Sequence, residues 1–115
     1  MKRGELWTLR DNDYSAKARP VVIVQADLEN NFDSIILCLF TTYASDNIST
    51  RIKIEPSNEN GLVRNSYVMT DKIVTVDKAL LGSKIGILSN DEMHQISGKL
   101  AKILNIHKND IEDAD

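Results

Sequence analysis

Four polar side chains stand at the ends of apolar segments, where folding could bring them together. Arg19 comes directly before one apolar run, Thr41 and Thr42 close a second, and Asp71 interrupts a third. A guanidinium offers five donors in a planar fork that fits a phosphate. A threonine hydroxyl can donate to a phosphate oxygen or pass a proton, and a carboxylate can accept one. On one rim of a sheet, these groups could hold a scissile phosphate and stabilise its transition state without a metal.

Each of these residues also has an ordinary structural interpretation. An arginine before a buried strand is commonly a boundary charge, and threonines at strand ends are commonly strand formers. An aspartate between strands commonly makes a turn. Residue types and spacing alone favour the structural interpretation over the catalytic one.

Other kinds of chemistry have little support. The two histidines, His94 and His107, are far apart in the chain and have no companion cysteine, so no metal site is predicted. The single cysteine, Cys38, lies inside an apolar run and is expected to be a buried, inert thiol. Residues 82–86 lack the glycine spacing of a phosphate-binding or dinucleotide-binding loop. We therefore expect neither a metal nor a cofactor.

Length and composition predict one soluble domain. The chain has 115 residues, of which 42% are hydrophobic and 27% charged, enough for a single core. No segment approaches the roughly 20 apolar residues of a membrane span, and the N-terminus lacks the apolar region of a secretion signal. We expect a cytoplasmic protein with no membrane partner.

The net charge of −3 comes from the end of the chain, because residues 109–115 carry four acidic groups and no basic one. Residues 1–108 are close to neutral and form the predicted domain. Residues 109–115 are predicted to be an acidic, disordered tail.

Apolar patterns predict the strands that position the polar groups. Residues 20–25 and 34–41 are short, nearly continuous apolar runs, typical of central strands buried on both faces. The other predicted strands are residues 4–9, 50–55, 66–70 and 72–76. Residues 77–88 are expected to be a connection with a short helical turn at 77–81.

The last predicted element is a helix that begins after Ser89. Ser89 and Glu92 have capping-box spacing, and Gly98 either weakens the helix or marks a close packing contact. An apolar stripe at helical spacing is made of Met93, Ile96, Leu100, Ile103 and Leu104. The sum is a mainly β (α+β) fold, a small antiparallel barrel of five or six strands with a C-terminal helix.

The order of these segments over residues 2–106 resembles the MazF/PemK/Kid family of toxins from type II toxin–antitoxin systems. The matching pieces are Lys-Arg-Gly-Glu-Leu-Trp at 2–7, Arg-Pro-Val-Val-Ile-Val-Gln at 19–25, Asn30 with Phe32, Thr41 with Thr42, Gly61 with Leu62, the run 71–78 and the run 85–89. The resemblance implies an SH3-like, plasmid-maintenance-toxin barrel of about 5–7 strands that works as a homodimer. It also implies metal-independent, sequence-selective cleavage of single-stranded RNA, by attack of a ribose 2′-hydroxyl on the adjacent phosphate, and a cognate antitoxin as partner.

The same resemblance implies roles for individual residues. Arg19 and Thr41 correspond to the family's catalytic arginine and threonine, and Asp71 corresponds to an acidic residue that acts as base in some members. The RNA groove is predicted to be lined also by Lys17, Thr42 and Lys72.

Two departures limit what the resemblance implies. The loop 11–18 is short and has no glycine, so the preferred RNA sequence does not transfer. Met69 stands where some members carry an arginine, so Asp71 has less support as a base than Arg19 and Thr41 have in their roles.

Two other functions fit the same fold. A CcdB-like toxin binds DNA gyrase and cuts no RNA, but such binding leans on a C-terminal Trp-Gly-Ile end, and this chain has an acidic end instead. The near-neutral residues 1–108 also permit an inactive family member that only binds RNA or a partner.

Overall fold

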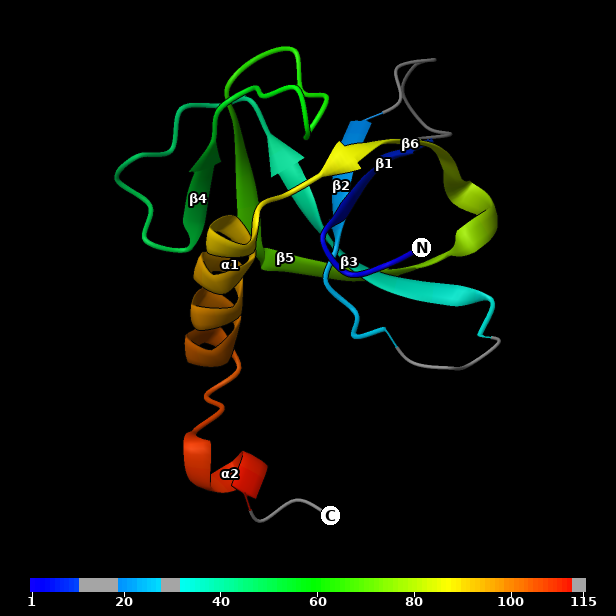
Figure 1. Cartoon of the computed structure of the whole chain (residues 1–115). Helices are drawn as coiled ribbons and strands as arrows, with labels where there is room; N and C mark the ends of the chain where they lie inside the picture. Colours follow the sequence, from blue (N-terminus) through cyan, green and yellow to red (C-terminus); the bar gives the residue numbers. More distant parts are fainter. Residues whose placement is uncertain (11–18, 28–31, 113–115) are drawn as a thin grey trace.

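The computed structural model describes residues 1–10, 19–27 and 32–112. Within these residues the chain forms one sheet and two α-helices (Figure 1). The elements are β1 (Glu5–Leu9), β2 (Arg19–Ile23), β3 (Ser34–Thr41), β4 (Arg51–Ile54), β5 (Ser66–Asp77), the 3-10 helix η1 (Lys78–Leu80), β6 (Leu81–Ile87), α1 (Asn90–Ile103) and α2 (Lys108–Glu112).

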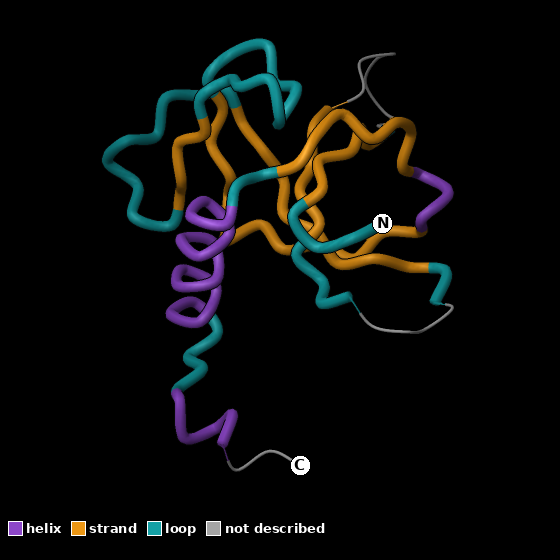
Figure 2. Tube along the Cα trace, viewed as in Figure 1, coloured by secondary structure: helices purple, strands orange, loops and turns teal. Residues whose placement is uncertain are grey.

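The six strands form one antiparallel sheet in the order β4-β5-β3-β2-β1-β6. The sheet curls strongly, and α1 lies beside β4 and β5 (Figures 1 and 2). The predicted mainly β fold with a C-terminal helix is confirmed. The sheet is open rather than a closed barrel, because β4 and β6 are its two edges.

The loop after β4 reaches across to the opposite edge of the sheet. The Ile87 N–H of β6 donates to the Glu59 carbonyl at 2.9 Å. Gly86 permits this approach, since a Cβ there would lie 2.3 Å from the same carbonyl oxygen. Asn60, 1% exposed, shapes the loop because its Oδ1 accepts from the N–H groups of Ser57 and Leu62. A backbone contact and a buried amide thus take the place of strand pairing between the edges.

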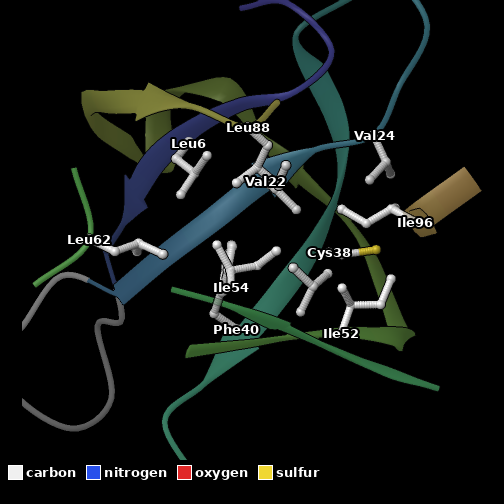
Figure 3. Packing of buried hydrophobic residues seen from close by; sticks show 11 residues of the cluster. Leu6, Val22, Val24, Cys38, Phe40, Ile52, Ile54, Leu62, Leu88 and Ile96 are labelled. Atoms are coloured by element: carbon white, nitrogen blue, oxygen red, sulfur yellow. The ribbon is translucent and has the colours of Figure 1, made fainter. Parts of the chain in front are cut away.

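Alternate residues of the central strands pack into two apolar layers. Cys38 and Phe40 of β3 join the layer that α1 covers (Figure 3), whereas Leu37 and Leu39 join a second layer with Val21. Burial on both faces explains why the segment 34–41 is nearly continuous in apolar residues. Burial also raises the pKa of the Cys38 thiol to about 11, so the prediction of a buried, inert cysteine is confirmed.

Two parts of the strand prediction were wrong. Residues 66–70 and 72–76 belong to one strand, β5, whose register against β3 shifts between the Met69 and Ile73 pairs. The expected connection 77–88 contains the short helical turn as η1, but it continues as β6. Gly82 and Gly86 are poor strand formers, and β6 exists because β1 offers it a pairing edge.

The capping box of α1 is confirmed. Ser89 Oγ accepts from the Glu92 N–H at 3.1 Å, and a Glu92 carboxylate oxygen accepts from the Ser89 N–H at 2.9 Å. Ile96 is fully buried, but Ile103 and Leu104, predicted to share its stripe, are 39% and 54% exposed. The sheet ends before the last turn of α1, so only the first part of the apolar stripe is covered (Figure 1).

A short helix, α2, occupies most of the segment predicted to be a disordered tail. The Lys108 ammonium lies 3.5 Å from the Glu112 carboxylate one turn later, and Asp110 Oδ2 accepts from the His107 N–H at 2.8 Å. Such local contacts suit a helix that packs no buried residue. The division into a domain at 1–108 and a tail at 109–115 stays a prediction.

Gly98 lies within α1, and its surroundings show whether it makes a close packing contact. An added Cβ there would meet no atom within 4 Å, so the close packing contact considered for this residue is absent. We expect Gly98→Ala to raise the free energy of unfolding by about 1 kcal/mol, measured by urea denaturation, because alanine restricts the unfolded chain. Gly86→Ala is the contrasting variant, and its clash with Glu59 should lower stability. A loss of stability in Gly98→Ala would contradict the packing described here.

Glu5 is a buried carboxylate that joins β1 to β6. Its Oε1 accepts from the Lys2 N–H and from Trp7 Nε1–H, each at 3.0 Å, and its Oε2 lies 3.1 Å from Lys84 Nζ. Burial alone raises the pKa of Glu5, but these hydrogen bonds and the Lys84 charge outweigh it and lower the pKa to about 2.

The depressed pKa predicts acid sensitivity. Glu5 stabilises the fold fully above its unfolded pKa of 4.5, and this contribution is lost as the pH falls from there toward 2. We expect Glu5→Gln to lower the unfolding free energy by roughly 2 kcal/mol at pH 7, and the difference from wild type should shrink below pH 4.5. Denaturant curves across this pH range measure it, with exposed Glu55→Gln as the control. A constant difference at every pH would contradict the assignment.

Candidate active site

The register of the central strands brings Arg19 and Thr41 to one place. Val21 of β2 pairs with Leu39 of β3, and continuing this antiparallel register by two residues sets Arg19 opposite Thr41. Opposed residues in such a pair share one face, with Cβ atoms roughly 5 Å apart. Arg19 is exposed and Thr41 half-buried. A cation and a hydroxyl therefore stand together on the rim of the most buried part of the sheet.

Backbone contacts orient the Thr41 hydroxyl. Its Oγ1 accepts from the Tyr43 N–H at 3.1 Å. Since a hydroxyl carries one proton and this bond uses it as an acceptor, the Thr41 proton remains available as a donor. Thr42, the next residue, is exposed just after β3. The geometry suits Thr41 for donating to a phosphate oxygen.

Asp71 and Lys72 lie farther along the sheet, at the irregular part of β5. Thr41 pairs with Tyr67, and Asp71 is four residues beyond Tyr67, up to about 13 Å along the strand. Asp71 Oδ1 also accepts from Thr50 Oγ1 at 3.2 Å. Asp71 and Lys72 are both exposed. The structure thus places Arg19 and Thr41 at the same end of the β2–β3 pair and Asp71 and Lys72 in the irregular part of β5, opposite Cys38 and Leu39.

Lys17 lies outside the described residues, as do Asn30 and the loop 11–18. Its role in the RNA groove stays a prediction.

The structure adds two residues to this face that sequence reasoning did not assign to the site. Tyr67, directly opposite Thr41, is 4% exposed and donates its hydroxyl proton to Asp46 Oδ1 at 3.0 Å. Burial and this hydrogen bond raise the pKa of Tyr67. Arg51 pairs with Met69, one position along the same strand face. Only the strand pairing reveals the neighbours of Arg51.

The described residues contain neither a metal-ligating cluster nor a membrane-spanning helix. No group of three or more His, Cys, Asp and Glu side chains in residues 1–10, 19–27 and 32–112 is arranged to hold a metal ion. His94 is exposed on α1, and His107 Nε2 lies 2.8 Å from Asn105 Oδ1. Among the described helices, none is long and apolar enough to cross a membrane.

Comparison with known protein families identifies the family of this chain. The family of PemK-like, MazF-like toxins of type II toxin–antitoxin systems matches residues 2–104. The chain belongs to this family. The match covers β1 to α1 and includes both Arg19 and Thr41.

Two named relatives align with most of the length of this chain. The probable endoribonuclease MazF of Mycolicibacterium smegmatis is 35% identical over 107 residues, which cover 92% of this chain and 98% of that protein. The endoribonuclease MazF of Staphylococcus saprophyticus is 30% identical over 91 residues, covering 77% and 75% of the two chains.

Solved structures share the fold. A mycobacterial endoribonuclease in complex with its cognate antitoxin superposes with a TM-score of 0.77 at 28% identity, covering 93% of this chain and 97% of that one. The Mycobacterium tuberculosis toxin MazF-mt6 superposes with a TM-score of 0.75 at 20% identity, over 90% and 98% of the two chains. At that identity, the second match shows the fold alone.

The Tyr67–Asp46 bond predicts a measurable contribution to stability. We expect Tyr67→Phe to lower the unfolding free energy by about 1 kcal/mol, because it removes this hydrogen bond without changing the ring that fills the site. Tyr43→Phe is the matched control. Because Tyr43 is 74% exposed, the loss of its hydroxyl should leave the unfolding free energy unchanged. Thermal or urea unfolding measures both variants. Equal effects of the two substitutions would show that the Asp46 contact contributes nothing.

Proposed function

We propose that this MazF-like chain is the toxin of a type II toxin–antitoxin system and acts as a sequence-selective endoribonuclease on single-stranded RNA. The observation that supports the proposal is the register of β2 and β3, whose last pair, Val21 with Leu39, lies two residues from Arg19 and from Thr41, in a chain whose relatives are named endoribonucleases. A cation and a hydroxyl donor on a rigid support match the charge that develops on a phosphate during cleavage.

The reaction uses the RNA, these side chains and solvent water. A ribose 2′-hydroxyl gives its proton to water and bonds to the adjacent phosphorus to form a 2′,3′-cyclic phosphate, while the bond from phosphorus to the 5′-oxygen breaks and that oxygen takes a proton from water and leaves as a hydroxyl. Arg19 binds the non-bridging oxygens of the phosphate and stabilises the additional negative charge of the transition state. Thr41 donates a hydrogen bond to one of these oxygens, as its contact with Tyr43 favours.

We assign Asp71 to RNA binding in this proposal, whereas the family resemblance suggested the role of a base. The bond of Asp71 to Thr50 favours contact with a flanking nucleotide over proton abstraction at the scissile phosphate. Thr42 and Lys72, both exposed, are assigned to the same extended groove. Base selection occurs along this groove because single-stranded RNA exposes its base edges.

The partners follow from the family. A structural relative is an endoribonuclease in complex with its cognate antitoxin, and we assign this chain an antitoxin partner too. The working form is a homodimer in the cytoplasm, where both mRNA and an antitoxin are found.

Cleavage in EDTA tests the function and its two central residues. We expect wild-type protein to cut a long RNA at discrete sites, and Arg19→Ala to reduce the rate by at least 100-fold without unfolding. Thr41→Val should reduce kcat strongly, and Thr41→Ser should restore part of it because the hydroxyl returns. Thr75→Val, on the exposed part of β5, is the matched control.

The 5′ ends of the products map the preferred sequence. Intact RNA with wild-type protein, combined with inhibition of DNA gyrase, would instead support a CcdB-like binder. Full activity of Arg19→Ala would overturn the active-site assignment.

A further inference from the structure

Arg51 is a cation on the same sheet face as the Arg19–Thr41 pair. Its neighbour in β4, Ile52, points into the layer that α1 covers, so Arg51 points to the opposite face. Arg51 pairs with Met69, and Lys53 pairs with Tyr67, which in turn pairs with Thr41. β5 therefore separates Arg51 on β4 from Thr41 on β3. Along the strands, Arg51 lies two residues from the level of Thr41. Adjacent nucleotides of an RNA strand can span this separation.

Buried contacts hold the Arg51 guanidinium in place. Nη1 donates to Ser45 Oγ at 2.9 Å. Ser45 is fully buried, and its Oγ in turn donates to the Tyr43 carbonyl at 2.7 Å. The same short segment supplies the Tyr43 N–H that contacts Thr41. One loop thus links the orientation of Arg51 to that of Thr41.

One donor of the guanidinium has no partner among the described residues. Its Nε is buried and has no hydrogen-bond partner in the described part of the chain. The ion pairs seen there join Lys84 to Glu5 and Lys108 to Glu112, so neither supplies Arg51 with a counter-charge. Buried donors without partners are rare and destabilise the fold. Arg51 as a whole is half-buried, so a ligand that brings negative charge can approach its side chain from solvent.

We propose that Arg51 binds the phosphate of a nucleotide next to the scissile one, and that Ser45 is the residue that positions its guanidinium. The inference rests on the proposed function and extends it to a second phosphate site. Phosphate is the favoured ligand because Arg19 and Lys53 lie on the same face and a guanidinium fork fits its oxygens. An RNA strand held at both sites has its direction across the sheet determined, with the scissile bond at Arg19.

Binding to an uncleavable strand tests this site separately from cleavage. The probe is a fluorescent single-stranded oligodeoxynucleotide of mixed sequence, which lacks the attacking 2′-hydroxyl. We expect Arg51→Met to weaken its binding about 10-fold or more. The slope of log affinity against log salt should fall by roughly 0.7, the value for one lost phosphate contact on a single strand. Ser45→Ala should act in the same direction, more weakly.

Controls separate a binding role from a structural one. Lys102→Met, an exposed cation on α1, which covers the opposite face of the sheet, also removes one positive charge and should leave both the affinity and RNA cleavage unchanged. The urea midpoint of Arg51→Met should equal or exceed that of wild type, because methionine keeps the stem and removes the unpaired donor. In RNA cleavage, Arg51→Met should raise KM and leave kcat nearly unchanged.

The outcomes are distinct. Wild-type cleavage with unchanged affinity, salt slope and KM in Arg51→Met would overturn this inference and leave the nuclease assignment standing. Absence of cleavage by wild type would overturn the proposed function, while the oligonucleotide measurement would still decide the phosphate site. Binding of an oligoglutamate peptide that depends on Arg51, without any effect on the oligonucleotide, would assign the site to an acidic protein partner instead.

Discussion

The pairing of β2 with β3 is the constraint on which the rest of the molecule depends. Val21, Val22 and Ile23 are fully buried, since strands flank β2 on both edges and apolar layers cover both faces. A slip of one residue would turn every one of these side chains toward the wrong layer, so the register is strongly specified. The same register carries Arg19 to the level of Thr41. Core packing and active-site geometry are therefore set together.

Asp71 is set apart from the Arg19 and Thr41 end of the sheet because the register of β5 against β3 shifts between Met69 and Ile73. At the irregularity, the Thr70 N–H donates to the Thr50 carbonyl in the buried interior, while Asp71 faces the Thr50 hydroxyl at the surface. The result is a compact pair at Arg19 and Thr41 and a second polar group some distance away. A long polar face suits a chain of phosphates and bases better than a small ligand.

The segment between β3 and β4 links packing to chemistry. Its Ser45 is fully buried beneath Arg51, and its Asp46 accepts the Tyr67 hydroxyl proton. Most buried polar atoms in proteins are paired, and the Arg51 Nε is the exception within the described residues. That exception lies on the face that carries Thr41.

Local signals in the sequence determined the central strands, the helix start at Ser89 and the residue types available for chemistry. A strand buried on both faces reads as a continuous apolar run, and a capping box is complete within four residues. The family resemblance assigned Arg19 and Thr41, and the strand register places both residues at the same end of the β2–β3 pair.

Only the tertiary structure decided which distant residues meet. β6 lacks a strand signal of its own and forms because β1 offers an edge. The separation of Asp71 from Thr41 and the approach of Ser45 to Arg51 depend on a register shift and on a loop conformation. Such contacts join segments far apart in the chain, and their energies depend on packing across the sheet, which no local pattern of residues encodes.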